Sequence, residues 1–261
     1  KKQIFILLNR NSKNPSFNDF KSLYPREKFD RNIFKIWRWL FIGRLSLFIS
    51  WLSVRLNISA NIITLLSFLF GLMSLYLFSP SPNHNIFYGA LCLNFSYLLD
   101  CSDGHIARFN KRSSSLGKFL DDSLGELIYI PFWIFIGFGL NHFPDQFVNY
   151  IFLKLNLDIS QYIIIISIIT SLSYAIRIII SFRFSACFLE VDKKDLISSN
   201  THPNIFKIIY KNLLIIGGGL GPLLIIFSYF QIISALVVFY SMLYSFNFIY
   251  SYNNFLKKLL K

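Results

Sequence analysis

Hydrophobic residues along the chain fall into six long runs separated by short polar segments. The runs lie at about residues 60–79, 86–103, 119–140, 161–182, 213–230 and 232–250. Each is close to the ~20 residues that an α-helix needs to cross a bilayer. The pattern predicts an all-α integral membrane protein in which residues 58–261 form one domain of six transmembrane helices.

The residues before the first run have a different pattern. Residues 1–30 are polar and basic, and they predict a cytosolic N-terminal segment with little regular structure. In residues 31–57, basic side chains alternate with three tryptophans: Trp37, Trp39 and Trp51. This alternation is typical of an interfacial amphipathic helix whose aromatic face lies among lipid headgroups. The alternative is an ordinary amphipathic helix packed on protein.

Composition and charge agree with a membrane protein. The chain is 54% hydrophobic and 18% aromatic, and a water-soluble fold of that composition would expose large apolar patches. The net charge of +13 comes from Lys and Arg before the first run, in alternate connections and at the C-terminus. By the positive-inside rule, both termini are cytoplasmic in a multi-pass plasma (inner) membrane protein. Nucleic acid is not needed to explain the charge.

The fifth run is interrupted by a cluster of glycines. Its sequence from Gly217 to Pro222 is GGGLGP. Small residues let helices approach closely in lipid, and proline kinks a helix, so we interpret the cluster as tight packing with a kink. A phosphate-binding loop is disfavoured because no strand precedes it.

Carboxylates stand at the end of the second run and the start of the third. At ~100° per residue, one helical face carries two acids and two small residues: Asp100, Asp103, Gly104 and Ala107. On the third run, Gly117 and Asp121 are four residues apart and share a face. If the two helices pack antiparallel across the short turn between them, the three aspartates converge. These acids lie at the predicted cytosolic end, which disfavours a transporter with acids at the bilayer midplane.

Three carboxylates close together near a membrane repel one another unless a cation lies among them. Mg²⁺ prefers oxygen ligands and is commonly shared with substrate phosphates. The small residues beside the acids would leave space for a nucleotide, and Arg108, Lys111 and Arg112 would face its phosphates. The alternative is that the acids merely pair with these three basic residues at the helix end.

The combined spacing is Asp100-x2-Asp103-Gly104-x2-Ala107-Arg108-x8-Gly117-x3-Asp121. This pattern resembles the signature of the CDP-alcohol phosphotransferases. Asn61 and Thr64 resemble the family's Asn-x-x-Thr at the head of the first spanning helix, and Ser115 matches a serine often found before the glycine. The resemblance covers roughly residues 45–250 as architecture.

The resemblance implies a transferase that moves a phosphoalcohol from a CDP-alcohol to an acceptor hydroxyl and releases CMP. It implies Mg²⁺ or Mn²⁺ held by Asp100, Asp103 and Asp121. The implied nucleotide pocket contains Asn61, Thr64, Gly104, Ala107, Arg108, Ser115 and Gly117. It also implies a homodimer, and the chain length favours a small bacterial type. The donor is either CDP-diacylglycerol or a CDP-linked polar alcohol, used in phospholipid or related glycolipid or phosphonolipid synthesis.

The chain departs from the family pattern at Gly125, where the family has a fourth aspartate that is thought to act as general base. Asp122 and Glu126 flank this position. One interpretation is that Glu126, Asp122 or His105 removes the acceptor proton instead. His105 has a second interpretation, as a surface-facing residue at the helix end.

Two other interpretations of Gly125 need no substitute base. The acceptor is already anionic, or its hydroxyl is deprotonated by the metal or by a substrate phosphate. Alternatively, the protein binds CDP-alcohols without turning them over, or Gly125 is an introduced mutation. The competing function is therefore a catalytically impaired or non-enzymatic CDP-alcohol-binding membrane protein.

Two arginines are candidates for binding the acceptor. Arg177 lies inside the fourth apolar run and Arg183 follows near its cytosolic end. An arginine within an apolar helix usually faces a polar cavity, so both are expected to bind an anionic acceptor. The alternative for Arg177 is snorkelling to the headgroup layer.

Overall fold

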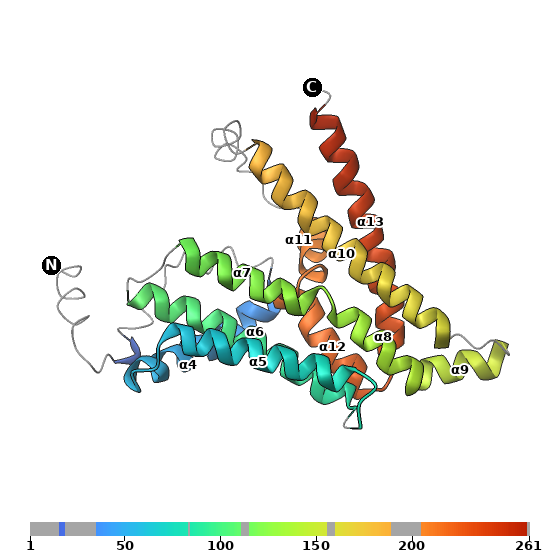
Figure 1. The fold of residues 1–261 in the computed structure, drawn as a ribbon, viewed down its shortest axis with the longest axis horizontal. Helices are drawn as coiled ribbons and strands as arrows, with labels where there is room; N and C mark the ends of the chain where they lie inside the picture. Colours follow the sequence, from blue (N-terminus) through green and yellow to red (C-terminus); the bar gives the residue numbers. More distant parts are fainter. Residues whose placement is uncertain are drawn as a thin grey trace. The chain divides into compact units, whose positions relative to one another are not determined.

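The structure is a computed structural model of the chain (Figure 1). It describes residues 16–18, 35–82, 84–110, 115–155, 160–188 and 205–259. Within these ranges there are helices and turns and no β-strand, which confirms the all-α class. Most of the predicted N-terminal segment, residues 1–30, lies outside the described residues.

The chain forms two compact units. Unit 1 comprises Lys1–Ser74, Tyr88–Ile128 and Ile209–Pro222. Unit 2 comprises Leu75–Phe87, Tyr129–Ile208 and Leu223–Lys261. Each unit is described by itself.

The first long helix among the described residues of unit 1 runs from Ile36 to Arg55. It contains a π-helical turn, η2 (Arg38–Ile42), before α4 (Gly43–Arg55). The Gly43 N–H donates to the Arg38 carbonyl across this wide turn. A Cβ atom on Gly43 would lie 2.8 Å from the same carbonyl oxygen, closer than side chains tolerate. Glycine at position 43 therefore suits the π-helical turn.

The two faces of α4 differ in an unusual way. Small serines are buried against the protein: Ser46, Ser50 and Ser53. Large apolar side chains are exposed on the other side: Leu45, Phe48 and Leu52. The Ser50 hydroxyl donates to the Ser102 carbonyl at 2.9 Å. An exposed apolar face agrees with the predicted amphipathic helix, and its location at the membrane interface stays a prediction.

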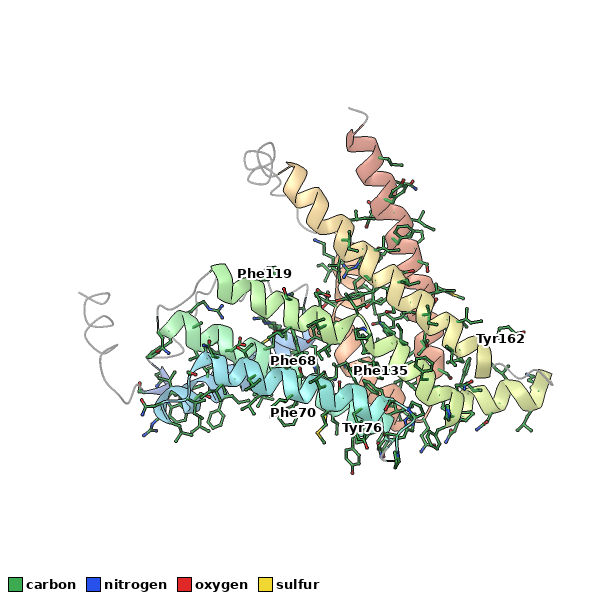
Figure 2. The ribbon with its side chains drawn as sticks, in the orientation of Figure 1. Phe68, Phe70, Tyr76, Phe119, Phe135 and Tyr162 are labelled. Atoms are coloured by element: carbon green, nitrogen blue, oxygen red, sulfur yellow. The ribbon has the colours of Figure 1, made fainter. Side chains whose placement is uncertain are left out.

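Serines also join α5 (Ala60–Phe78) and α6 (Ile86–Phe109), which lie side by side in Figure 1. The Ser67 hydroxyl donates to the Ser96 carbonyl at 2.9 Å, and the Ser96 hydroxyl donates to the Ser67 carbonyl at 2.8 Å. Phe70, labelled in Figure 2, meets Phe95 edge-on with 4.7 Å between ring centroids. Small hydroxyl residues let these two backbones approach closely.

Unit 1 also contains most of α7 (Ser115–Tyr129), the second half of α11 (Ile205–Leu213) and the π-helical turn η4 (Ile216–Leu220). Gly217 lies against the Tyr97 hydroxyl, where a side chain has no space, and Gly218 has non-helical φ/ψ angles of −100° and −111°. Tight packing at the glycine cluster is confirmed. The kink is at Gly218, and Pro222 lies in the first turn of α12 (Gly221–Tyr229), where a missing N–H is tolerated.

Unit 2 is built around three helices: α8 (Phe132–His142), α10 (Ser160–Phe188) and α13 (Ile233–Leu259). Figure 1 shows α10 and α13 running side by side. Trp133 is fully buried, with ring centroids 5.2 Å from Tyr240 and 6.3 Å from Tyr244. An aromatic cluster of this kind gives unit 2 its core.

Asp145 connects two helices of unit 2 at the start of α9 (Gln146–Leu155). Its carboxylate accepts the Val148 N–H at 3.1 Å, the Ser234 N–H at 2.7 Å and the Ser234 hydroxyl at 2.6 Å. These donors belong to the first turns of α9 and α13, whose N–H groups have no partner within their own helices. Asp145 is therefore a shared helix cap.

The membrane character of the protein is confirmed, whereas the count of six spans stays a prediction. Within the described residues, four helices are long and apolar enough to cross a bilayer: Ala60–Phe78, Ser123–His142, Tyr162–Ile180 and Ile233–Asn253. The fifth run contains a shorter apolar helix, Ile216–Tyr229. The third run contains a turn at Ile130 and Pro131 between α7 and α8, although Ser123–His142 as a whole qualifies as a candidate span. Helices α9 and α11 were not predicted.

Candidate active site

The two acids of α6 occupy different environments in unit 1. Asp103 is buried, with 4% of its surface exposed, whereas Asp100 is half-buried. The Thr64 hydroxyl, from the second turn of α5, lies 2.5 Å from Asp103 Oδ2 and 3.1 Å from the Ala60 carbonyl. The shorter distance indicates a charge-assisted hydrogen bond from Thr64 to the carboxylate. The predicted nucleotide residue Thr64 thus contacts a predicted metal ligand.

Hydrophobic side chains pack next to these acids. Ile63, Leu99 and Ile106 form a buried cluster between α5 and α6. Ile49 and Val54 of α4 and Ile58 pack against it. The cluster includes the residues directly before Thr64 and Asp100, so it fixes the backbone from which both polar side chains extend.

Arg108 folds back over the end of α6. Its Nη2 atom lies 3.0 Å from His105 Nδ1. A Cβ atom on Gly104 would be 3.3 Å from the guanidinium, so the absence of a side chain at Gly104 makes space for Arg108. The predicted open space beside the acids is therefore occupied by a flexible cation.

The surface-facing interpretation of His105 is wrong, because only 5% of its surface is exposed. A guanidinium can only donate, so the His105 ring accepts at Nδ1 and its proton is on Nε2. In this arrangement neither ring nitrogen is available as a base. The interaction with Arg108 therefore weakens the prediction that His105 removes the acceptor proton.

Glu126 lies on α7, where its side chain is half-buried and its Oε2 atom is fully buried. Gly125 precedes it within the same helix. The side chains of Asp121, Asp122, Ser115 and Gly117 lie outside the described residues, although their backbones belong to α7. Convergence of three aspartates therefore stays a prediction.

The other predicted nucleotide residues lie on the same two helices. Asn61 is exposed in the first turn of α5, and Ala107 is half-buried on α6. Both therefore belong to unit 1 together with Asp100 and Asp103. Their contact with a nucleotide is a prediction.

The donor atoms present suit a hard divalent cation. Asp100 and Asp103 supply carboxylate oxygens from adjacent positions on one helical face, and oxygens are the ligands that Mg²⁺ prefers. Among the described side chains, no group of three or more His, Cys, Asp and Glu residues is close enough to hold a metal. The predicted third ligand, Asp121, has a side chain outside the described residues, so the three-aspartate metal site stays a prediction.

The N-terminal helix makes contacts within unit 1 that sequence analysis did not predict. The Asn212 side chain accepts the Ile36 N–H at 2.7 Å, and Asn94 accepts the Trp37 indole N–H at 3.1 Å. Asn94 in turn donates to the Gly221 carbonyl at 3.1 Å. Trp37 is therefore half-buried and contacts protein through its indole N–H, and its predicted place among the headgroups stays a prediction. The sequence around Trp37, which is followed directly by Arg38, did not indicate the hydrogen bond from Trp37 to Asn94.

Lys35 directly precedes this helix, and Arg38 lies in its first turn. Burial lowers the pKa of Lys35 below its usual value, and the positive charge of Arg38 lowers it further, whereas Cys101 and Asp100 act in the opposite direction. Lys35 therefore interacts electrostatically with Asp100 and Cys101 of α6 as well as with Arg38.

Arg177 belongs to unit 2. Its guanidinium lies 5.1 Å from the ring centroid of Tyr174, a cation–π contact. Its Nε atom is buried and has no hydrogen-bond partner within the described part of the chain. The side chain of Arg183 lies outside the described residues. Arg177 is half-buried, and both its predicted role in acceptor binding and the snorkelling alternative stay open.

The fold and the two aspartates of α6, Asp100 and Asp103, define a class: helical membrane proteins with paired carboxylates on one helix. Comparison with known families makes this more specific: the family model described as CDP-alcohol phosphatidyltransferase matches residues 57–191, about half of the chain. The chain belongs to the CDP-alcohol phosphatidyltransferase family. Members transfer a phosphatidyl group from a CDP-alcohol to an alcohol acceptor in a membrane, and generally use a divalent metal. No curated protein matches the chain.

Proposed function

We propose that this protein transfers a phosphatidyl group or a polar phospho-headgroup from a CDP-alcohol to an acceptor hydroxyl and releases CMP. The observation that carries the proposal is the pair Asp100 and Asp103, with Asp103 buried and bonded to Thr64, inside the part of the chain that matches the family. A buried carboxylate at a membrane boundary is costly unless it binds a cation or donors, and a substrate–metal site provides the cation.

Asp100, Asp103 and Asp121 would hold Mg²⁺ or Mn²⁺. When bound, the ion neutralises charge on the diphosphate and on the departing phosphate. Thr64 holds Asp103 in a fixed rotamer through its hydroxyl. Asn61, Gly104, Ala107, Ser115 and Gly117 would line the nucleotide pocket. Arg108 would move from Gly104 to a phosphate oxygen, exchanging one hydrogen-bond acceptor, His105, for a charged one.

The proton of the acceptor goes to Glu126 in this proposal. The acceptor oxygen forms a bond to the β-phosphorus of the CDP-alcohol, the bond from that phosphorus to the bridging oxygen breaks, and CMP leaves with the electron pair. Glu126 is proposed because it flanks the family position Gly125. His105 stays a candidate, since Arg108 would leave His105 Nδ1 when it moves to the phosphate. Asp122 stays a second candidate on the same helix.

Arg177 and Arg183 would bind an anionic acceptor. Buried polar groups in proteins are nearly always hydrogen-bonded, and the acceptor would supply the partner that Arg177 Nε lacks among the described residues. By the family resemblance, we further propose a homodimer in a bacterial inner membrane, with the site and both termini in the cytoplasm.

Incubation of the purified protein with labelled CDP-diacylglycerol, Mg²⁺ and a panel of alcohols tests the proposal. CMP and one new labelled lipid should form together and require the cation. Hydrolysis without an acceptor, or no CMP with any acceptor, contradicts it. A panel of CDP-linked polar alcohols with diacylglycerol tests the second donor class in the same assay.

Gly125 specifically favours the second function, a CDP-alcohol-binding protein without turnover. This function predicts saturable CDP binding and no CMP release. The Gly125→Asp variant would then gain turnover from a silent background. Robust CMP release by the unmodified chain eliminates this second function.

A further inference from the structure

Helix α9 connects two candidate membrane spans, Ser123–His142 and Tyr162–Ile180, and one of its sides is exposed. On this side Leu153 is 82% exposed, the largest exposed fraction among the large hydrophobic residues that the structure describes. Tyr150 is exposed one turn earlier, and Lys154 donates to its hydroxyl at 3.1 Å. The level of α9 along the spans decides what this side contacts.

Contacts within unit 2 hold α9 at the end of several helices. Asp145 accepts N–H groups from the first turns of α9 and α13, and the Gln146 N–H donates to the Gln231 carbonyl at 2.9 Å. The turn between α5 and α6 lies at the same end, because His84 stacks on Phe143 with 4.8 Å between ring centroids. These contacts place α9 level with the ends of α5, α8 and α13, which we call the turn end of unit 2.

Exposed aromatic side chains gather at the turn end. Tyr76 and Tyr162, both labelled in Figure 2, belong to the last turn of α5 and the first turn of α10. The exposed set is Tyr76, Phe143, Tyr150, Tyr162, Tyr229 and Phe230. Tyrosine and tryptophan are enriched where membrane proteins pass through the headgroup layer. The set therefore indicates that the turn end lies at a membrane boundary.

Helix α13 provides an independent measure of this level. It begins at the turn end with Ile233, and exposed tyrosines recur on it at Tyr250 and Tyr252. The rise from Ile233 to Tyr252 is about 29 Å at about 1.5 Å per residue, which matches the ~30 Å hydrocarbon core of a bilayer. Between them Met242 and Phe246 are exposed and apolar. The length of α13 therefore agrees with a turn end at one boundary of the hydrocarbon.

We propose that α9 is an interfacial helix that binds the lipid headgroup layer at the turn end of unit 2. Tyr150 and Leu153 enter this layer, and Lys154 contacts headgroup phosphates with its ammonium group. Lipid is favoured over a second copy of the chain, because the exposed aromatic residues belong to several helices at one level and not to α9 alone.

This inference goes beyond the proposed function and does not depend on the transfer reaction. Helix α9 joins α8 to α10, so its attachment to the headgroup layer would fix the depth of both spans. Arg177, the proposed acceptor residue, lies on α10. The depth of α9 would therefore also set the depth of Arg177 in the membrane.

Photoreactive lipids test the inference on the unmodified full-length protein in phosphatidylcholine vesicles. One probe lipid has a diazirine in its headgroup, and the other has a diazirine at the end of an acyl chain. Peptide mass spectrometry identifies the labelled segments. The headgroup probe should label α9, whereas the acyl-chain probe should label α13 around Met242. If the headgroup probe does not label α9, or if only the acyl-chain probe labels it, the inference is overturned.

Two variants test the side of α9 that contacts lipid. Leu153→Asn removes the apolar side chain, and Asn149→Gln is the matched control at another exposed position of the same helix. Leu153→Asn should lower headgroup labelling of α9 by about threefold or more, because burial of a leucine side chain changes an equilibrium more than about tenfold. Asn149→Gln should stay within about twofold, as is usual for surface substitutions. Unchanged labelling of α9 in Leu153→Asn would overturn the inference.

Labelling around Met242 by the acyl-chain probe shows whether the spans of each variant remain inserted. The ratio of protein to lipid then distinguishes lipid from a second copy of the chain. A constant yield of α9 labelling at all ratios supports the inference. A yield that rises on dilution into excess lipid would show that a second copy covers α9, and would overturn it. CMP release is not a readout, so these results do not depend on whether the proposed function holds.

Discussion

Each unit of the molecule contains a deeply buried aspartate, and the two are used differently. Asp145 in unit 2 is 8% exposed, and both of its oxygens accept hydrogen bonds from the first turns of α9 and α13. Asp103 in unit 1 is 4% exposed, receives a side-chain hydroxyl, and has Asp100 three residues before it. Burial alone therefore does not identify a catalytic acid. The proposed role of Asp103 depends on two other features, the hydroxyl donor and the second carboxylate at Asp100.

The comparison is tested most strongly by changing each aspartate to asparagine. Asp103→Asn should lower kcat/KM for CMP release by more than about 100-fold, because even outer partners of metal ligands contribute 10–100-fold. Asp145→Asn should retain most of the activity per folded molecule. Initial rates at several Mg²⁺ concentrations provide the measurement. Equal losses in both variants would show that buried acids of both kinds serve only the fold.

Glu126 tests whether unit 1 also contains the base. Glu126→Gln keeps the shape of the side chain and removes its basicity, so kcat should fall by about 100-fold, the low end of general-base contributions. CDP affinity should be unchanged, because the proposed role concerns the acceptor proton. The double variant Gly125→Asp, Glu126→Gln should regain rate if the family position can substitute. An undiminished rate in Glu126→Gln removes Glu126 as the base.

Asp145→Ala should reveal the structural role of the unit 2 acid. The substitution leaves three donors without their acceptor and should lower the free energy of unfolding by about 2–4 kcal/mol. Thermal unfolding in detergent, followed by tryptophan fluorescence, measures the change. Asn149→Ala, an exposed neighbour on α9, is the control and should have little effect. A stable Asp145→Ala protein would contradict the cap interpretation.

Arg177 tests whether unit 2 has only a structural role, because it is the residue of unit 2 that we propose to bind the acceptor. Arg177→Ala should raise the KM for an anionic acceptor about tenfold, the loss expected for one charged hydrogen bond. The KM for the CDP-alcohol should stay the same. An unchanged KM for the acceptor in a folded variant would return Arg177 to a packing role over Tyr174.

The parts of the fold that depend on local pattern could be predicted from the sequence. Helical spacing alone placed Asp100 and Asp103 on one face of α6. The long apolar runs were recognisable even where they contain serines. The break between α7 and α8 was missed because Pro131 is flanked by apolar residues on both sides. Helix α9 was missed because its polar residues, Gln146, Asn149 and Lys154, are typical of a loop between two membrane spans.

The contacts around the N-terminal helix could not be predicted, because they join residues far apart in sequence. Asn94 and Trp37 are separated by 57 positions, and Asn212 and Ile36 by 176. An asparagine inside an apolar run indicates a buried amide but does not indicate its partner. His105 shows the same limit, since its burial depends on packing around α6 and not on its place near the helix end.

The wide turn at Arg38–Ile42 has a consequence for how this helix can change. A π-helical turn contains one residue more than an α-helical turn, and each residue advances an α-helix by about 100°. A methyl group at Gly43 would collide with the Arg38 carbonyl. If Arg38–Ile42 became α-helical while α4 stayed in place, the first turn of the helix would rotate by about 100° around the helix axis. One glycine thus sets the rotation about the helix axis between α4, with its exposed apolar side chains, and the first turn, which contains Arg38.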